Sequence, residues 1–501
     1  MDTTSNMRPF PAINYSNNSI ALHDGAAMWS YTELRQRIDR FASGLLGKTR
    51  DLNEERVALF MPASVDYVTT LLGIWRAGGI AIPLNTAAAM PEIEHVLSSA
   101  KVTRLVLSIG SNPESLAPLH VLCKSLNIEV ATVPELLSDK ITVMPELKIE
   151  RRAMMLFTSG TTNKPKGVVT THANIRAQIT TLLDAWKWQS DDAIPLFLPL
   201  HHIHGIINVL CCGLWIGARI VLFPKFDMSR ILTQVADRDY TVFMAVPTVY
   251  VKIIGHLDTL SEQKRQQVCA GFKAMRLNIS GSAACPVKLY NHWRELTGQT
   301  LLERYGMTEI GMGISNPYHG ERRAGAVGMP LPGVEIGLFD DDGKLIEVDD
   351  VPGEIRVKGA NVFLEYWDNP SATKESFMGD WFCTGDVAVR ETGYYRIMGR
   401  SSVDIIKSGG YKLSALEIEG TLLMHPAVEE CAVIGMPDDT WGESVTAFVV
   451  LKVDQELDLK TLKYWCETRM SAYKIPKTLR VVESLPRNAM GKVVKPTLKT
   501  L

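Results

Sequence analysis

Short apolar runs alternate with helical patterns along most of the chain, and this alternation constrains the fold more than any other feature of the sequence. The first helix starts with the capping sequence Ser30-Tyr31-Thr32-Glu33 and continues to Leu46 with apolar residues at helical spacing. A second helical pattern, 64–77, lies between the apolar runs 57–61 and 79–84. Strands that alternate with helices in this way form mostly parallel sheets covered by helices. The sequence therefore predicts an α/β protein.

The later part of the chain first extends this pattern and then departs from it. Further buried strands are expected at 104–107, 220–223, 242–245 and 277–279. From residue 353 onward the pattern changes to short, turn-rich strands, expected at 354–357, 381–384 and 394–398. After residue 400 we expect helices at 414–424 and 459–469 and strands at 430–434, 445–451 and 478–482.

A chain of 501 residues is long enough for two domains, and the change of pattern places a boundary after residue 399. Residues 1–399 are expected to form a large, multi-layer N-terminal α/β domain with mostly parallel sheets. Residues 400–501 are expected to form a small α+β C-terminal domain.

Composition and charge exclude several classes of function. The formal net charge is −2 and no basic block occurs, so a nucleic-acid partner is not expected. The eight cysteines show no C-x-x-C spacing, which argues against a zinc site or a disulfide framework. No apolar run reaches the ~18 residues of a membrane span, and the first residues lack the pattern of a secretory signal or transit peptide. We therefore expect a cytoplasmic protein without a membrane span.

A loop rich in hydroxyls and glycines lies between two apolar runs. Its sequence is Thr158-Ser159-Gly160-Thr161-Thr162-Asn163-Lys164-Pro165-Lys166-Gly167. Glycine lets the backbone approach a ligand closely, and hydroxyl and lysine side chains donate hydrogen bonds to phosphate oxygens. The spacing differs from that of a Walker loop. The stretch predicts a strand, a polyphosphate-binding loop and a second strand, and a polar hairpin turn is the alternative.

The pattern T-S-G-T-T-x-K-P-K-G resembles the phosphate loop of the adenylate-forming superfamily of acyl-CoA synthetases, luciferases and peptide-synthetase adenylation domains. These enzymes attack the α-phosphate of ATP with a carboxylate, release pyrophosphate and pass the acyl group to a thiol. The resemblance covers essentially the whole chain and implies a C-terminal lid that rotates between the two half-reactions. Asn163 replaces a glycine that many relatives carry, and asparagine tolerates a left-handed backbone better than most residues. In this loop the resemblance implies ATP contacts from Thr158, Ser159, Gly160, Thr161, Thr162 and Lys166.

A second motif, Arg304-Tyr305-Gly306-Met307-Thr308-Glu309, follows the strand-like pair Leu301-Leu302. By itself it is a loop with a carboxylate, and a solvated turn is the alternative interpretation. The resemblance implies that Arg304, Tyr305 and Gly306 bind ATP, that Thr308 contacts the α-phosphate and that Glu309 binds Mg²⁺. A Mg²⁺ that bridges phosphates needs one or two carboxylate oxygens and little else from the protein.

Two further segments match the nucleotide site of the superfamily. Asp386, in Thr384-Gly385-Asp386 at the end of an expected strand, matches the residue that binds both ribose hydroxyls, and Arg400 matches its support. A carboxylate accepts two such hydrogen bonds at once. The loop Gly281-Ser282-Ala283 resembles the segment that lies against adenine.

The C-terminal region carries the residues implied for catalysis and thiol binding. Pro486-Arg487-Asn488-Ala489-Met490-Gly491-Lys492 resembles the catalytic-lysine motif of the superfamily. Adenylation builds charge on the α-phosphate and the attacking carboxylate, so a cation supplied by Lys492 would stabilise the transition state. Gly409-Gly410-Tyr411 matches the loop that lines the CoA channel, and the hinge is expected within 401–404.

Two other segments narrow the choice of acid. The stretch 198–205 is rich in histidine, and Lys252 follows a segment that lines the acid pocket in relatives. The wider sequence resembles malonyl-CoA synthetases most, in which an arginine or lysine at the place of Lys252 pairs with the distal carboxylate. A lysine on a helix surface is the alternative interpretation. The implied acid-binding residues are His202, Lys252 and Met307, with His204 as the alternative imidazole and weaker roles for Arg322 and Arg323.

Together these motifs imply an ATP-dependent acid–CoA ligase that uses Mg²⁺, ATP and CoA and most closely resembles enzymes that make malonyl-CoA from malonate. Two alternatives within this chemistry are a CoA ligase for another short-chain, medium-chain or aryl acid and an adenylating enzyme that loads a carrier protein. A nucleotide-binding relative without activity is a third, against which Glu309, Asp386 and Lys492 argue. The sequence leaves open whether the protein forms a homodimer.

Overall fold

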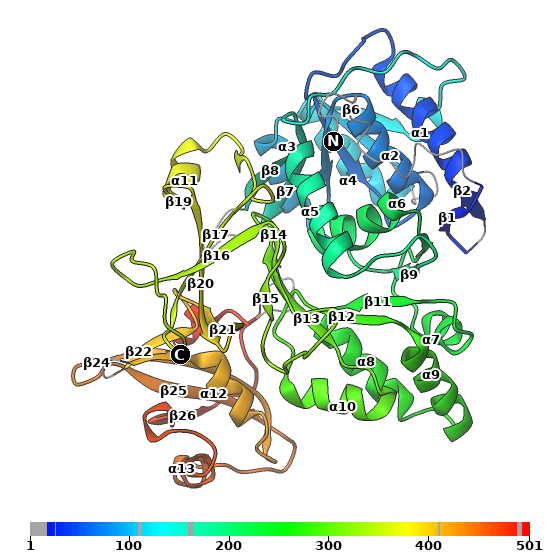
Figure 1. Ribbon diagram of the computed structural model, residues 1–501. Coiled ribbons are helices and arrows are strands. Elements are labelled where there is room, and N and C mark those ends of the chain that lie inside the picture. The colour runs from blue at the N-terminus through cyan, green and yellow to red at the C-terminus, as the bar shows by residue number, and fades with distance from the viewer. Residues whose placement is uncertain are drawn as a thin grey trace. The chain divides into compact units, whose positions relative to one another are not determined.

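The computed structural model describes residues 18–25, 27–108, 113–158, 165–408, 411–487 and 493–500. The chain divides into two compact units (Figure 1). The first unit comprises Met1–Gly325, Pro330–Glu335 and Lys358–Phe377, and the second comprises Ala326–Met329, Ile336–Val357 and Met378–Leu501. The α/β class expected from the sequence is confirmed.

The first helix forms where its capping sequence predicts it. α1 spans Tyr31–Leu46, and Ser30 and Glu33 form both hydrogen bonds of a capping box. The Glu33 carboxylate accepts from the Ser30 N–H at 2.8 Å, and the Ser30 hydroxyl accepts from the Glu33 N–H at 3.2 Å. The expected strand–helix–strand unit that follows is also present, as β3 (Arg56–Phe60), α2 (Val65–Arg76) and β4 (Ile80–Pro83).

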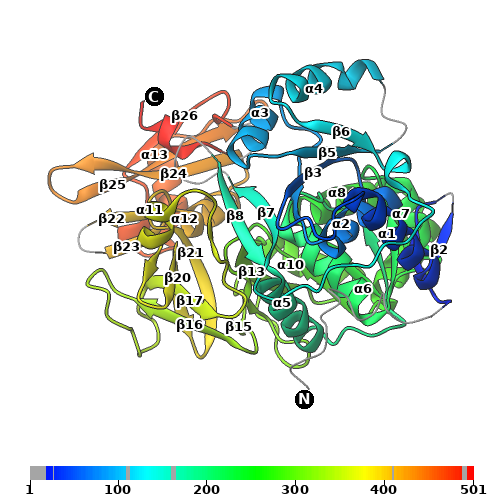
Figure 2. The same cartoon turned by 90° about the horizontal axis from the view of Figure 1, so that it is seen from above.

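A seven-stranded sheet forms one core of the first unit, in the order β18-β8-β7-β4-β3-β5-β6. Its central strands are parallel, and only β8 and β18 run antiparallel to their neighbours. α3 and α4 pack on the β5–β6 side, as Figure 2 shows. The remaining bounds are β5 (Arg104–Leu107), β6 (Glu129–Thr132), β7 (Arg152–Thr158), β8 (Lys166–Thr171), β18 (Glu365–Tyr366), α3 (Met90–Ser99), α4 (Pro113–Ser125), η2 (Pro134–Leu136) and α11 (Pro370–Glu375).

A second sheet of the first unit has the order β11-β12-β13-β14-β15, and its first three strands are parallel. Four helices, α7 to α10, bury one apolar cluster with this sheet, and Figure 1 shows α8 and α10 along it. The strands are β11 (Val242–Ala245), β12 (Leu277–Ser280), β13 (Leu302–Met307), β14 (Gly311–Ser315) and β15 (Met329–Pro330). The helices are α7 (Met228–Ala236), α8 (Pro247–Leu257), α9 (Glu262–Ala274) and α10 (Val287–Thr297).

A four-stranded sheet, β2-β1-β10-β9, completes the first unit together with three helical segments. One of these, η3, is a π-helix that the sequence patterns do not predict, and it begins at the histidine-rich segment. π-helical turns are rare and are frequently found at functional sites. The bounds are β1 (Ile20–His23), β2 (Met28–Ser30), β9 (Ala193–Leu196), β10 (Arg219–Leu222), α5 (His172–Ala185), η3 (His204–Cys211) and α6 (Cys212–Ile216).

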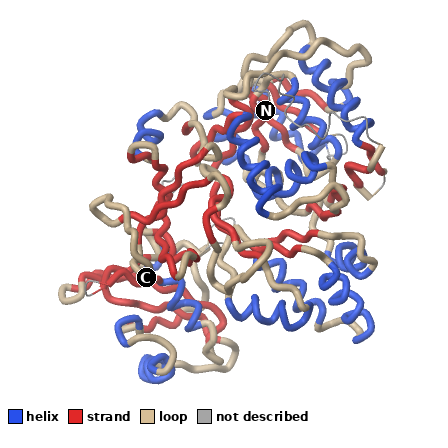
Figure 3. Tube along the Cα trace, in the orientation of Figure 1, coloured by secondary structure: helices blue, strands red, loops and turns tan. Residues whose placement is uncertain are grey.

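Strands dominate the second unit (Figure 3). One sheet has the order β16-β17-β20-β19, with β21 paired to β20, and the other has the order β23-β22-β25-β24, with β26 paired to β25. The strands are β16 (Val334–Phe339), β17 (Gly353–Gly359), β19 (Phe377–Met378), β20 (Trp381–Glu391), β21 (Tyr394–Arg400), β22 (Ile405–Ser408), β23 (Tyr411–Ser414), β24 (Val428–Asp438), β25 (Gly442–Leu451) and β26 (Thr478–Val481). The helices are α12 (Ala415–Leu422), α13 (Leu459–Glu467), η4 (Ala472–Lys474) and α14 (Lys495–Leu498).

The compact second unit contains parts of the chain that precede residue 400. Compactness describes which residues pack together, whereas the expected boundary after residue 399 concerns a lid that rotates during catalysis. That boundary stays a prediction. Within the described part of the chain, no helix is both long enough and apolar enough to span a bilayer.

Two helical glycines in the first unit differ in their surroundings and give a test of its packing. An added Cβ on Gly271 in α9 would overlap the carbonyl oxygen of Val235 in α7, whereas a Cβ on Gly255 in α8 would meet no atom within 4 Å. We expect Gly271→Ala to lower the free energy of unfolding by about 1–3 kcal/mol, because overpacking forces the two helices apart. Gly255→Ala, the matched control, should raise it by up to about 1 kcal/mol, because alanine stabilises a helix interior. Urea denaturation measures both, and equal effects would contradict the close packing of α7 on α9.

Candidate active site

The expected phosphate loop connects two strands that pair directly. β7 and β8 are antiparallel, and Thr158 at the end of β7 pairs with Lys166 at the start of β8. The expected strand–loop–strand arrangement is therefore present, with Thr158 and Lys166 at the base of the loop. The other residues assigned to this loop, Ser159, Gly160, Thr161 and Thr162, lie outside the described residues.

Tyr366 in β18 lies at the base of the same loop. β18 pairs with β8, so that Tyr366 is opposite Val168. The Nζ of Lys166 lies 5.1 Å from the centroid of the Tyr366 ring, within the range of a cation–π contact. The Tyr366 hydroxyl donates a hydrogen bond of 3.0 Å to Oε1 of Glu309. One tyrosine thus contacts two residues that the sequence analysis assigns to the nucleotide site.

The Y-G-M-T-E motif lies in a hairpin, whereas the sequence analysis expects a loop after the strand-like pair at 301–302. β13 extends through Met307 because Arg304 pairs with Ser315 and Tyr305 with Ile314 on β14. Pairing with a strand that follows in the chain is not visible in the local pattern. Thr308 and Glu309 form the connection between the two strands.

Glu309 is suited to hold a cation. Its side chain is buried, with 5% of the residue exposed, and it contacts the Tyr366 hydroxyl. Its backbone is fixed as well, because its carbonyl accepts from the Phe363 N–H at 2.7 Å and the next carbonyl, of Ile310, accepts from Nδ2 of Asn361 at 2.5 Å. A carboxylate is the ligand type that Mg²⁺ prefers. Glu309 therefore fits as a protein ligand for a magnesium ion, which would neutralise phosphate charge.

Arg304 is a buried guanidinium beside the expected adenine loop. Only 4% of the residue is exposed, and burial lowers the pKa of its guanidinium to about 10. Its Nη2 donates to the Ser282 hydroxyl at 3.3 Å, its Nε has no hydrogen-bond partner, and among the described residues no carboxylate forms an ion pair with it. A Cβ on Gly281 would overlap the guanidinium, so a larger residue there would require the Arg304 side chain to shift. A buried cation of this kind requires an anion.

The histidine-rich segment places one imidazole next to Arg304. His204 is buried, and its Nδ1 lies 3.1 Å from the Ser282 hydroxyl. Burial and the neighbouring charge of Arg304 hold the pKa of His204 well below its usual range, so its imidazole is neutral. The His201 and His202 rings lie 4.2 Å apart between centroids at a tilt of 49°, and burial lowers the pKa of His201 to about 3. His202 itself is exposed.

The remaining acid-binding candidates lie in different environments. Lys252 is exposed on α8, and Met307 is half-buried at the end of β13. Arg322 donates to the backbone carbonyls of residues 300, 317 and 318, at 2.6, 3.2 and 3.0 Å, which ties its guanidinium to the local chain. Arg323 forms an ion pair with Glu321 at 3.0 Å.

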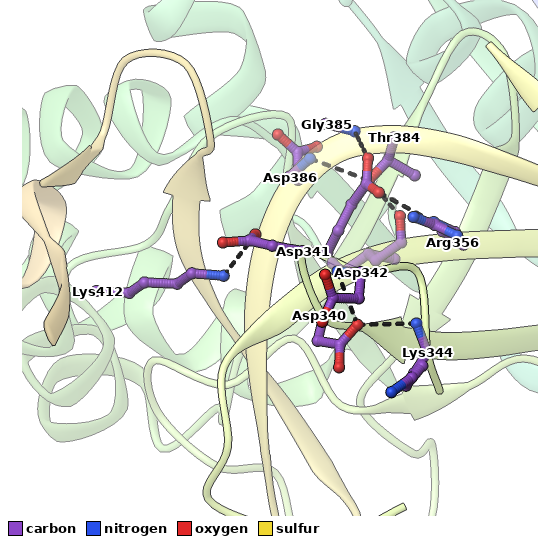
Figure 4. A network of polar contacts seen from close by, with 11 residues as sticks. Asp340, Asp341, Asp342, Lys344, Arg356, Thr384, Gly385, Asp386 and Lys412 are labelled. Atoms are coloured by element: carbon purple, nitrogen blue, oxygen red, sulfur yellow. Dashed lines mark hydrogen bonds and ion pairs between the residues drawn. The ribbon is translucent and has the colours of Figure 1, made fainter. Parts of the chain in front are cut away.

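In the second unit, Asp386 and Arg400 face each other across a hairpin. Asp386 was expected at the end of a strand. The strand β20 instead continues to Glu391, because it pairs with β21. Asp386 is therefore directly opposite Arg400, and Nε of Arg400 lies 2.9 Å from Oδ1 of Asp386. Arg400 also donates to the Thr384 carbonyl at 2.8 Å, and Figure 4 shows Thr384, Gly385 and Asp386 of β20 from close by. Asp386 is 8% exposed and its carboxylate is held in one orientation.

The segment assigned to the CoA channel is anchored from two sides within the second unit. Tyr411 stacks on Tyr473 with 4.6 Å between ring centroids and 7° between ring planes. Lys412 forms an ion pair of 2.8 Å with Asp341 in the turn between β16 and β17, which Figure 4 shows. Gly409, Gly410 and the expected catalytic Lys492 lie outside the described residues.

The expected hinge segment is tied to the last helix of the chain. Asp404 accepts from the Arg400 N–H at 3.1 Å and forms an ion pair of 2.6 Å with Lys495 in α14. Lys495 is buried and also pairs with Glu419 at 2.7 Å, and these two carboxylates raise its pKa. No sequence motif indicated the contacts of Tyr366 with Glu309 or of Lys495 with Asp404 and Glu419. A lysine three residues after Lys492 and an aromatic residue in a short strand carry no distinctive signal by themselves.

Comparison with known proteins agrees with this arrangement of motifs. The family model described as AMP-binding enzyme matches residues 12–367, and the model described as AMP-binding enzyme C-terminal domain matches residues 417–492. The mitochondrial malonate–CoA ligase of Bos taurus is 42% identical over 480 residues, which cover 89% of this chain and 81% of the relative. The malonate–CoA ligase of Arabidopsis thaliana is 39% identical over 480 residues, or 89% of this chain and 78% of the relative.

A solved structure extends the similarity to the three-dimensional fold. ATP-bound MatB from Rhodopseudomonas palustris matches with a TM-score of 0.86 and 33% sequence identity, covering 97% of this chain and 96% of that one. The family match and the relatives both span most of the chain. The protein therefore belongs to the AMP-binding enzyme family, which is the adenylate-forming superfamily that its motifs resemble.

Proposed function

We propose that the protein is an ATP-dependent, AMP-forming malonate–CoA ligase. Malonate would displace pyrophosphate from the α-phosphorus of ATP to give malonyl-AMP, and the thiol of CoA would then displace AMP to give malonyl-CoA. Relatives named malonate–CoA ligase, 39–42% identical to this chain, support this assignment. The structural observation that carries it is the buried Arg304 in the first strand of the Y-G-M-T-E hairpin, a cation without a carboxylate partner among the described residues.

For the first half-reaction, the chain offers groups that bind each part of the nucleotide. Asp386, oriented by Arg400, is proposed to accept hydrogen bonds from both ribose hydroxyls. The loop Gly281-Ser282-Ala283 is proposed to lie against adenine, and Thr158, Lys166 and Thr308 to contact phosphates. Glu309 would hold a Mg²⁺ ion, which when bound neutralises phosphate charge. Lys492 is proposed to stabilise the charge that develops as the carboxylate attacks.

For the second half-reaction, Gly409, Gly410 and Tyr411 are proposed to line the channel through which the thiol reaches the adenylate. Glycine at two adjacent positions leaves room for the narrow pantetheine arm. The pivot of the C-terminal lid is proposed within 401–404, the segment that ends at Asp404.

Two cations are candidates for the second carboxylate of malonate. Lys252, favoured by the sequence, is exposed on α8 and already solvated, so it gains little from a partner. Arg304 is buried with Ser282 and the neutral His204 beside it, so an entering carboxylate would remove an unpaired buried charge. On this argument Arg304 has the stronger claim to the distal carboxylate, and its assignment to ATP is the competing proposal.

Three further points remain proposals. CoA is favoured over a carrier protein as the acceptor, because the relatives that match are named CoA ligases. A homodimer is proposed as the alternative to a monomer, to be decided by light scattering. The cytoplasm is the expected compartment, while the Bos taurus and Homo sapiens relatives are named mitochondrial, so cell fractionation decides between the two.

Replacement of Lys492 tests the mechanism. Lys492→Ala should slow the formation of malonyl-AMP by ~10²–10³-fold or more, because a cation aimed at developing charge is lost. Formation of malonyl-CoA from supplied malonyl-AMP should stay largely intact, since that step does not use this charge. Lys499→Ala, which removes an exposed lysine near the same terminus, is the matched control. Pyrophosphate release and thioester formation measure the two steps, and adenylation at the wild-type rate in Lys492→Ala would refute the assignment.

A panel of acids tests the substrate and its partner. Wild-type kcat/KM for malonate should far exceed that for acetate, propionate and butyrate, because polar recognition discriminates by ~10⁴-fold where one methylene gives ~10–200-fold. Lys252→Met and Arg304→Met should both lower the malonate-to-butyrate ratio, Arg304→Met by the larger factor because its charge is buried. Lys264→Met, which changes an exposed lysine on α9, is the control.

Two results of that panel would contradict the proposal at different levels. A wild-type preference for unbranched monocarboxylates would remove malonate and leave only the ligase class. An unchanged malonate-to-butyrate ratio in Arg304→Met, together with a raised KM for ATP, would assign Arg304 to the nucleotide and leave Lys252 as the partner of the acid.

A further inference from the structure

Tyr366 lies between a cation and an anion that the proposed reaction needs. Its hydroxyl donates to Oε1 of Glu309 at 3.0 Å, and the Nζ of Lys166 lies 5.1 Å from its ring centroid. The three residues come from β18, the Y-G-M-T-E hairpin and the base of the phosphate loop. Only 9% of Tyr366 is exposed, so these contacts form in a largely dry environment.

The backbone around Tyr366 fixes this arrangement from both sides. The Trp367 N–H donates to the Gly167 carbonyl at 2.8 Å, next to Lys166, and the Leu364 N–H donates to the Val169 carbonyl at 2.9 Å. On the other side, the Phe363 N–H donates to the Glu309 carbonyl at 2.7 Å. The segment 363–367 is therefore bonded to the phosphate-loop strand and to the hairpin at once.

A carboxylate with two rotatable bonds beyond Cβ would otherwise sample several orientations. A hydrogen bond from a phenol to a carboxylate is charge-assisted, and such bonds are about twice as strong as neutral ones. A ligand held in the productive orientation before its ion arrives binds it more tightly, because less entropy is lost on binding. The Tyr366 ring restricts Lys166 in the same way, because the Lys166 ammonium makes a cation–π contact with the face of the ring.

We propose that Tyr366 is a positioning residue for the magnesium–triphosphate site: its hydroxyl orients the Glu309 carboxylate toward the cation, and its ring keeps Lys166 beside the phosphates. It does not touch the reacting atoms and acts through these two side chains. The inference rests on the proposed function, because it takes Glu309 as the magnesium ligand.

Tyr366→Phe tests the hydroxyl alone, since the ring that contacts Lys166 and Phe363 is kept. The matched control is Tyr31→Phe in α1, which also removes one buried phenol hydroxyl, bonded there to the Ala218 carbonyl at 2.7 Å. Three quantities are measured for each variant and the wild type. They are the unfolding temperature without ligand, its rise on adding ATP with Mg²⁺ or with EDTA, and the Mg²⁺ concentration for half-maximal pyrophosphate release.

We expect Tyr366→Phe to need about tenfold more Mg²⁺ for half-maximal rate, the effect of losing one hydrogen bond to a charged group. High Mg²⁺ should restore most of the rate. The thermal shift by ATP with Mg²⁺ should shrink in Tyr366→Phe, while the shift by ATP with EDTA should match the wild type. Without ligand, Tyr31→Phe and Tyr366→Phe should lower the unfolding temperature by similar amounts. Tyr31→Phe should leave the Mg²⁺ requirement unchanged.

Two outcomes would overturn the inference. One is a wild-type Mg²⁺ requirement in Tyr366→Phe, and the other is an unfolding temperature far below that of Tyr31→Phe, which would make the hydroxyl structural. Failure of the proposed function is a separate result: the wild type would then release no pyrophosphate with malonate, while the Mg²⁺-dependent thermal shift would still report on Tyr366.

Discussion

A buried charge without a protein partner is the constraint on which this site depends. Arg304 is 4% exposed and bonds only weakly, through the 3.3 Å contact with Ser282, among the described residues. Breaking or omitting the partner of a buried ion costs several kcal/mol, so a protein keeps such a residue only where an anion binds or a function requires it. Gly281 leaves room for this guanidinium, because a Cβ there would overlap its present position. The unpaired charge thus explains the local sequence as well as the proposed affinity for an anion.

Elements with a local signal could be predicted from the sequence, and contacts between distant segments could not. The capping box of Ser30 and Glu33 lies within four residues, and the strands Arg104–Leu107 and Val242–Ala245 are short apolar runs, so their bounds match the expectation. β13 and β20 run longer than expected because each is extended by pairing with a later strand. The same limit applies to the site. The motifs identify Glu309 and Asp386, but the bond from Tyr366 to Glu309 joins residues 57 positions apart.

Each of the two units holds its own candidate groups through contacts within that unit. In the first, the hairpin and the phosphate-loop strands hold Glu309 and Lys166 through β18. In the second, Arg400 fixes Asp386, and the Lys495 ammonium joins Asp404 to Glu419. A buried ion triad of this kind adds little net stability, but losing one member leaves a buried charge unpaired. The triad therefore holds α14 next to the proposed pivot at 401–404. α14 directly follows the proposed catalytic segment.

Selectivity for a dicarboxylate follows from burial more than from charge alone. An exposed ammonium such as that of Lys252 is hydrated whether or not an acid is present, so its pairing gains at most about 1 kcal/mol. A buried guanidinium discriminates in both directions: it pairs with a second carboxylate, and it stays unpaired when a monocarboxylate occupies the pocket. His204, kept neutral by burial and by Arg304, can offer a hydrogen bond beside Arg304 without adding a second positive charge. With His204 neutral, Arg304 is the one cation of the proposed acid site, and the second carboxylate of malonate would balance its charge.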